Sequence, residues 1–360
     1  MTGRWLHIHV GYEKTASNVI QHALMDLRPA LRDHGLDYPV LEVGPDGYPR
    51  SGNAAHAFAR DARRHALLDA ADPAAHRGTV LSCEVLLLEQ DRRRNLRAVA
   101  QEALERGYDG LRFLLFVRDP ARHGPSLWQQ YLRTERALTT PLGPWLAETY
   151  DHPRLTADFL EAAEEIPHVE VEAHNHARLD APVDRIALRW LGLPDDLTPG
   201  PLPKGRDNVA MSPSQAALLL AINRHDASCR LSALTGVALR LADMRADHRR
   251  SEADAASLRA MFDRIEPDLA RAERFLPPTA RYDRHAPEAA EDGEPILRFL
   301  PEEIEAIARA LGETSSRLHA LEQDIAWRSP RARLDRMRRR WRRLRGGLRR
   351  RLGSRPARGG

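Results

Sequence analysis

The chain has 360 residues, 42% of them hydrophobic and 29% charged, so it is long enough to bury a large core. No apolar run approaches the roughly 20 residues that a membrane-spanning helix needs, and the N-terminus lacks the pattern of a signal peptide. The two cysteines, Cys83 and Cys229, are too few for a disulfide framework or a zinc site, so we expect reduced thiols in a cytoplasmic protein.

The net charge of +4 is distributed unevenly along the chain. Residues 328–360 contain fifteen arginines and one acid, Asp335, a net +14, which leaves −10 on residues 1–327. The sequence pI of 9.3 therefore describes the C-terminal segment rather than the rest of the chain. This distribution argues against nucleic-acid binding by the protein as a whole.

The first predicted element is a buried strand over residues 5–10, and a loop from 11 to 18 follows it before helical apolar positions begin at Ile20. A strand, a tight turn and a helix N-terminus form an anion site, because unpaired N–H groups and the helix dipole point at one spot. This loop contains Lys14, one of only two lysines in a chain otherwise rich in arginine. We expect its compact ammonium group to have a specific role.

Further strand patterns alternate with helical ones along the chain. Residues 79–83, 112–117 and 168–171 are short apolar runs typical of strands buried on both faces, and residues 95–106 and 182–191 have helical composition. The alternation predicts an α/β fold with a parallel sheet. Ligands of such sheets bind at the carboxyl ends of the strands, so we expect the loop at 11–18, Glu84 and the turn at 118–120 to converge there.

The C-terminal part is predicted to be helical and separate. Residues 194–203 read as a loop, residues 213–223 and 251–275 as helices, and residues 277–295 as a boundary. Apolar residues at alternating spacings of three and four then form a heptad stripe over 304–325, typical of a coiled-coil seam. The predicted domains are therefore 1–290, a linker and heptad-patterned helix over 291–329, and an arginine-rich tail over 330–360.

The loop differs from the P-loop of nucleoside triphosphatases, which needs Gly, four residues and then Gly-Lys-Ser/Thr. Here Glu13 precedes Lys14, and Gly11 lies three residues before the lysine. A short loop that ends in Lys-Thr, with Ser17 and Asn18 at the helix start, suits a phosphate or 5′-phosphosulfate group.

A second anion-binding motif follows the strand at 112–117. Arg118 at its end and Ser126 in the next helix would together hold one phosphate, through bidentate guanidinium contacts and a hydroxyl donor. A capped strand-to-helix turn accounts for the Arg-Asp-Pro sequence taken alone.

The two motifs resemble those of the 3′-phosphoadenosine-5′-phosphosulfate (PAPS)-dependent sulfotransferases, in particular bacterial members. The first family motif, approximately Lys-Thr-Gly-Thr/Ser-Thr-Ser-hydrophobic-Gln, is matched by residues 14–21, and the second, Val-Arg-Asp-Pro and then Ser-x-Trp, by residues 117–120 and 126–128. Similar stretches also occur at 35–39, 81–84, 190–193 and 207–212. The resemblance spans residues 1–290 and implies a P-loop NTPase-like sulfotransferase fold, here with a C-terminal helical arm.

The resemblance also implies which residues bind the donor. The 5′-phosphosulfate would be held by the loop residues Lys14, Thr15, Ala16, Ser17 and Asn18, and the 3′-phosphate by Arg118 and Ser126. Ala16 replaces the family's usual glycine, and because alanine favours negative φ the loop should be less free to adopt its geometry. Some sulfotransferases close a basic loop over the 3′-phosphate. Lys204 and Arg206 would form it here, although a solvated loop explains them equally well.

Sulfuryl transfer needs positioning, charge stabilisation and a base for the acceptor proton. Lys14 would stabilise the departing bisphosphate nucleotide. Glu84 is the first candidate for the base because it directly follows a buried strand, with pairing to an arginine as the alternative. His56 is the second candidate, since imidazole is the commonest base. Glu13 also adjoins the loop, but solvent exposure or an arginine partner would explain it. None of these residues requires a metal.

The sequence therefore predicts an enzyme that moves a sulfuryl group from PAPS to an acceptor hydroxyl, on a glycan or a lipid-linked sugar. A nucleotide-dependent kinase of related architecture is one alternative, but it would need the missing Gly-Lys-Ser/Thr loop and a carboxylate for magnesium. A catalytically inactive scaffold that forms a homodimer through the 304–325 stripe is another, and the intact Lys14 and Arg118 argue against it.

The tail at 331–352 combines an apolar stripe with arginines on its other faces. This pattern favours a helix that lies on an anionic membrane surface, at the inner membrane face near lipid-linked acceptors, or one that holds a polyanionic substrate. A solvated tail is the alternative. Nucleic acid is not an expected partner, because aromatic interleaving and groove-reading residues are absent.

Overall fold

The computed structural model describes residues 3–11, 13–44, 47–49, 51–55, 57–58, 60–72, 74–84, 86–88, 92–133, 138–201, 213–225, 253–284, 308–309 and 312–321. The chain divides into two compact units. The first is built from residues 1–130, 140–211 and 250–294, and the second from residues 131–139, 212–249 and 295–360.

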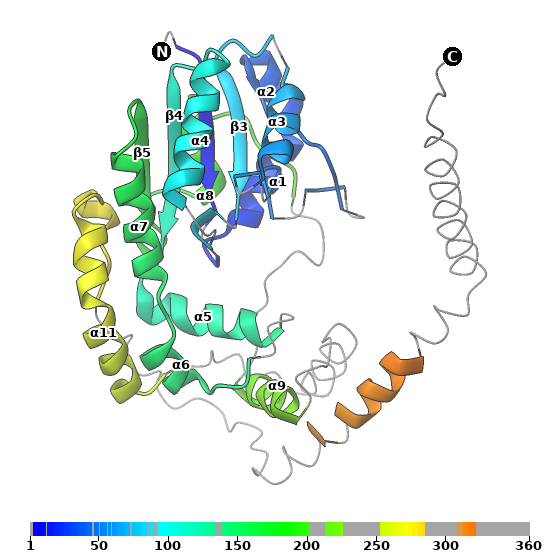
Figure 1. The fold of residues 1–360 in the computed structure, drawn as a ribbon, viewed down its shortest axis with the longest axis vertical. Helices are drawn as coiled ribbons and strands as arrows, with labels where there is room; N and C mark the ends of the chain where they lie inside the picture. The colour runs from blue at the N-terminus through cyan, green and yellow to red at the C-terminus, as the bar shows by residue number, and fades with distance from the viewer. Residues whose placement is uncertain are drawn as a thin grey trace, which may run out of the picture. The chain divides into compact units, whose positions relative to one another are not determined.

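Over its described residues, the first unit is built on a five-stranded, all-parallel sheet with the strand order β2-β3-β1-β4-β5 (Figure 1). The strands are β1 (Trp5–Val10), β2 (Leu36–Asp37), β3 (Gly78–Cys83), β4 (Gly110–Val117) and β5 (Val169–Asn175). The predicted α/β class and four of these strands are confirmed. Sequence reasoning missed β2, because a strand of two residues is too short to show a periodic pattern.

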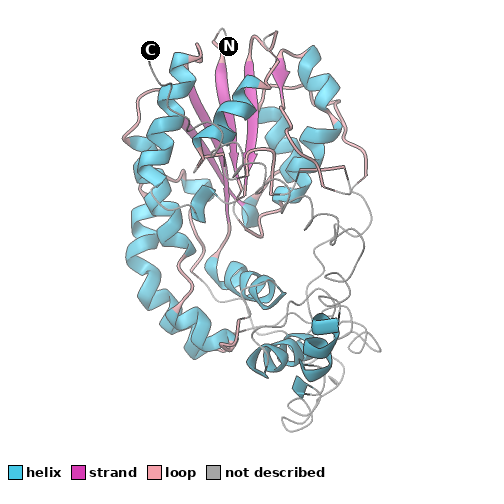
Figure 2. Cartoon of the chain, turned by 45° about the vertical axis from the view of Figure 1, so that its right-hand side comes forward, coloured by secondary structure: helices cyan, strands magenta, loops and turns pink. Residues whose placement is uncertain are grey.

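Helices cover both faces of this sheet (Figure 2). On one face lie α1 (Ser17–Asp26), α2 (Arg28–Asp33) and α8 (Val183–Trp190), whose apolar side chains share a core with β3 and β4. On the other lie α4 (Arg92–Glu105) and α7 (His152–Glu164), where Phe113 of β4 meets Phe159 edge to face. The remaining elements of the unit are α3 (Asp61–Asp69), α5 (Pro120–Arg133), which ends in the second unit, α6 (Leu142–Glu148), α11 (Ala255–Glu273) and the short 3-10 turns η1 (Leu86–Leu88), η2 (His176–Arg178) and η3 (Pro278–Ala280).

Strand burial follows the position of each strand in the sheet. The central strands β1, β3 and β4 are buried almost throughout, as predicted. The prediction that the strand beginning near His168 is buried on both faces was wrong, since Glu170, Val171 and Glu172 of β5 are exposed. The reason is topological: among the strands that the structure describes, β5 pairs only with β4 and forms an edge of the sheet.

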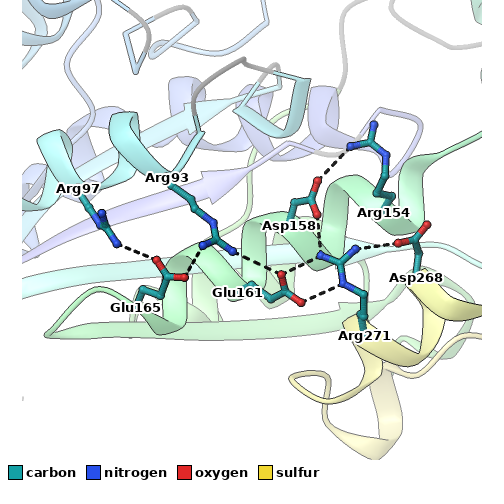
Figure 3. Close-up of polar contacts among 8 residues, drawn as sticks. All are labelled: Arg93, Arg97, Arg154, Asp158, Glu161, Glu165, Asp268 and Arg271. Atoms are coloured by element: carbon teal, nitrogen blue, oxygen red, sulfur yellow. Dashed lines mark hydrogen bonds and ion pairs between the residues drawn. The ribbon is translucent and has the colours of Figure 1, made fainter.

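Ion pairs fasten α11 to the outer surface of α7 (Figure 3). Arg271 of α11 makes a bidentate contact with Glu161 at 3.0 and 2.8 Å and also reaches Asp158, while Arg93 of α4 joins Glu161 to Glu165. These contacts raise the pKa of Arg271, the bond to Glu161 first and then that to Asp158. Because α11 leads into the segment 281–284, which bonds to the end of β5 and to the β4–α5 turn, this docking supports the carboxyl edge of the sheet.

The second unit is described over less of its length. Its helix α9 (Pro213–His225) bears a buried Asn223, whose Nδ2 donates to the carbonyl oxygens of Leu132 and Leu138. Residues 312–321 are helical, and Leu318 and Leu321 of the heptad stripe are exposed there. The coiled-coil seam over 304–325 stays a prediction, and the tail at 330–360 lies outside the described residues. Among the helices of the described ranges, none combines the length and hydropathy needed to cross a bilayer.

Candidate functional site

The loop after β1 has an alternating backbone conformation. Lys14 and Ala16 both have φ of 64°, in the left-handed region, and Ala16 caps α1 by accepting a bond from the Val19 N–H at 2.9 Å. Successive residues that alternate in this way turn their N–H groups toward one concave side, an arrangement that binds anions. Thr15 and Ser17 are buried within this turn, whereas Lys14 and Asn18 are half-buried.

Ala16 therefore adopts a backbone conformation that its Cβ disfavours. We expect Ala16→Gly to raise the free energy of unfolding by about 1 kcal/mol, because glycine has no Cβ to strain at positive φ. Urea denaturation measures the change. The control is Ala66→Gly on the exposed face of α3, where glycine should lower stability by about 1 kcal/mol instead. A loss of stability in Ala16→Gly would contradict the left-handed conformation.

The sheet register brings the three predicted polar clusters to one edge. Val10 pairs with Cys83 on one side and with Leu115 on the other, so Gly11 lies beside Glu84. A Cβ on Gly11 would come within 2.5 Å of the Glu84 Cα atom, which explains why only glycine fits at this close approach. From the far side, Nη1 of Arg118 donates to the Lys14 carbonyl oxygen at 3.0 Å.

Glu84 is held at the end of β3 by neighbouring segments. Its Oε1 atom accepts a bond from Nε2 of Gln21 on α1 at 3.0 Å, and its N–H donates to the Ser51 carbonyl at 3.1 Å. Tyr38 is fully buried nearby, and burial, with a contribution from the Glu84 carboxylate, raises its pKa above the ordinary range. Gln21, the last residue of the first motif, thus orients the carboxylate that we selected as the candidate base.

In the Arg-Asp-Pro turn, the aspartate is structural. Oδ1 of Asp119 accepts bonds from Nδ2 of Asn175, at the end of β5, and from the N–H of Asp283, both at 2.8 Å. The strand-to-helix turn begins α5 with the Asp119 carbonyl, which accepts bonds from the N–H groups of Arg122 and His123 at 3.0 and 2.8 Å, while the Asp119 side chain ties two other segments to this corner. Ser126 lies in the second turn of α5 and is half-buried.

The sequence analysis did not select two histidines near the site, His123 and His176, whose pKa values are lowered in part by nearby positive charges. The pKa of the buried His123 lies well below its ordinary value, because of burial first, then His152, and also the cations Arg118 and Lys14. The pKa of His176 is lowered by burial and by Arg118. The ladder pairs Val117 with Asn175, so the next residues along, Arg118 and His176, are neighbours. Lys14 of the loop and Arg118 of the β4–α5 turn therefore both place positive charge near His123.

Glu13 also differs from its prediction. Its carboxylate does not face open solvent: Oε1 accepts a bond from Nε2 of Gln130 at 3.0 Å, and Oε2 lies 3.5 Å from Nε2 of His152. The remaining candidates, His56, Lys204 and Arg206, lie outside the described residues. Over the ranges that the structure describes, no group of three or more His, Cys, Asp or Glu side chains is arranged to hold a metal ion.

Comparisons of this chain with protein-family models, with curated proteins and with solved structures each found no match.

Proposed function

We propose that this protein is a sulfotransferase with a P-loop NTPase-like fold, which moves a sulfuryl group from PAPS to an acceptor hydroxyl on a glycan or a lipid-linked sugar. The observation that carries the proposal is the bond from Arg118 to the Lys14 carbonyl, which joins the two motifs at one edge of the sheet. The strand order supports it as well, since the loop follows the central strand β1, beside β4 at the switch point of the sheet.

Each candidate residue of the site that the structure describes has a role in the proposed reaction. The loop from Lys14 to Asn18 binds the 5′-phosphosulfate, and Arg118 and Ser126 bind the 3′-phosphate. The acceptor oxygen attacks sulfur in line with the bridging oxygen, the sulfur–oxygen bond to the nucleotide breaks, and the acceptor proton passes to Glu84. Lys14 stabilises the negative charge that develops on the departing 3′,5′-adenosine bisphosphate.

Ligand-induced thermal stabilisation tests the donor site. We expect 3′,5′-adenosine bisphosphate to raise Tm, because a ligand at a hundred times its Kd adds about 2.7 kcal/mol of stability. Lys14→Ala and Arg118→Ala should lose this shift, and ATP with magnesium should not shift the wild type. Arg122→Ala is the matched control, since Arg122 is exposed in the same turn.

The other possible results of this experiment distinguish the proposal from its alternatives. A wild type that does not respond to the bisphosphate would refute the proposal. A shift with ATP and magnesium instead would favour the kinase. Nucleotide binding with no turnover in a screen of hydroxyl acceptors would favour the inactive scaffold.

We also propose that the tail at 331–352 attaches the enzyme to the inner membrane face. The support is its composition, an apolar stripe among arginines. A chain that ends at Ser329 should sediment with anionic vesicles far less than the full chain, and raised salt should release the full chain. Equal binding by the two chains would contradict this role of the tail.

A further inference from the structure

His123 occupies a fixed position beneath the anion loop. It lies in the first turn of α5 and is fully buried, with Nε2 at 2.7 Å from the Glu13 carbonyl oxygen and Nδ1 at 3.0 Å from the Tyr150 hydroxyl. A carbonyl oxygen only accepts, so the proton is on Nε2, and the hydroxyl of Tyr150 donates to Nδ1. The two partners therefore select one neutral tautomer of the ring.

The side chain of Glu13 is held by the same part of the molecule. Gln130, which contacts its carboxylate, is seven residues beyond His123 and so on the same face of α5. His152, at the start of α7, approaches the other carboxylate oxygen of Glu13 with its Nε2 atom. Its ring centroid lies 4.8 Å from that of His123, and its ring also stacks on Tyr150. Backbone and side chain of Glu13 are thus both held by groups from α5 and α7, of which His123 and His152 are buried.

This arrangement sets the direction of the loop's N–H groups. In a trans peptide the C=O and the following N–H point in opposite directions. His123 holds the carbonyl of Glu13 and Arg118 holds that of Lys14, so the N–H groups of Lys14 and Thr15 are directed away from these two side chains. Because Lys14 is held at positive φ, this orientation needs support from outside the loop.

We propose that His123, oriented by Tyr150, is a positioning residue that directs the loop's N–H groups at the 5′ anion of a bisphosphate nucleotide. The inference rests on the proposed function, which it deepens. His123 does not touch the ligand in this role. Its contribution is to fix the donors before the ligand arrives, so that binding does not have to order them.

The test separates a positioning role from a purely structural one. His123→Leu removes the donor, whereas His123→Gln retains an amide N–H near the place of Nε2. Tyr150→Phe removes only the hydroxyl behind the ring. The matched control is Tyr108→Phe, which also breaks a buried hydroxyl bond, to Thr79 at 2.7 Å, but at the opposite end of β3.

Two measurements are made on each full-length variant: the Kd for 3′,5′-adenosine bisphosphate by calorimetry, and amide hydrogen exchange over residues 14–18 without ligand. We expect His123→Leu to raise Kd about tenfold or more and to speed exchange in the loop. Tyr150→Phe should raise Kd about threefold, and His123→Gln should stay within about threefold of wild type. Tyr108→Phe should lower Tm without changing Kd.

The outcomes distinguish this inference from the function on which it rests. If wild type binds the nucleotide and Tyr150→Phe and His123→Leu bind it equally well, His123 has no positioning role. Should His123→Leu fail to fold, an unchanged Kd and unchanged loop exchange in Tyr150→Phe would overturn the inference alone. If the wild type does not bind although its loop is protected from exchange, the proposed function is wrong, and the assignment of His123 to a nucleotide is wrong with it.

Discussion

Glu84→Gln is expected to lower kcat for sulfuryl transfer by about 10²–10⁴-fold, the usual contribution of a general base. The Kd for 3′,5′-adenosine bisphosphate should stay within about threefold of wild type, because the amide keeps the shape of the carboxylate. The bond from Gln21 fixes this side chain at the end of β3, beside the loop that would carry the donor. The measurement uses radiolabelled donor and an acceptor identified by screening hydroxyl-bearing glycans and lipid-linked sugars.

The matched control for this variant is Glu105→Gln. Glu105 is exposed at the end of α4 and accepts a bond from Gln101, so its substitution should leave kcat unchanged. An unchanged kcat in Glu84→Gln would show that another group takes the acceptor proton, and His56 would be the next residue to substitute.

Acid is expected to unfold this protein, because two histidines are buried on the central strand. His7 and His9 of β1 face the helices α1 and α8, and burial lowers the pKa of each to about 3, helped in His7 by Arg112 and Arg77. Within the described residues, Nε2 of His9 and Nδ1 of His7 have no hydrogen-bond partner, so a proton there gains no acceptor.

The sign follows from proton binding. As pH falls below about 6.5, both histidines become protonated in the unfolded chain. In the folded chain they stay neutral until the pH approaches about 3. The free energy of unfolding is therefore highest above pH 6.5 and falls between pH 6.5 and 3. The loss is on the order of a few kcal/mol for each residue, comparable in sum with the 5–15 kcal/mol stability of a typical domain. The free energy of unfolding from urea titrations between pH 7 and 4 measures it.

Variants identify the groups responsible for this acid sensitivity. His9→Leu and His7→Leu should each flatten the fall in stability, even if they change its value at pH 7. The exposed His76→Gln should leave the slope as in wild type. Equal slopes in all four proteins would mean that other groups, such as the carboxylates paired with Arg271, control the acid sensitivity.

The strands that carry the site were predictable because the strand pattern depends on residues that are close together in the sequence. The apolar run before Gly11 and the run before Arg118 each gave a strand with correct limits to within two residues, and parallel topology then placed their ends together. The exposure of β5 was missed, although the alternation of valine and glutamate over residues 169–172 is typical of a strand with one solvated face. The contacts of Glu13 could not be predicted for a different reason: Gln130 and His152 are more than a hundred residues away in the chain.

The sequence by itself determined an α/β chain with a lysine-containing loop after its first strand and an arginine directly after a later strand. Those features follow from spacing and residue type over a few turns of chain. Only the tertiary structure decided how the loop is held: the left-handed Ala16, the carbonyls bonded to His123 and Arg118, and the carboxylate oriented by Gln21. The reason is that buried polar groups must find partners once water is excluded, and here the partners come from distant segments that meet only when the sheet and its helices have packed.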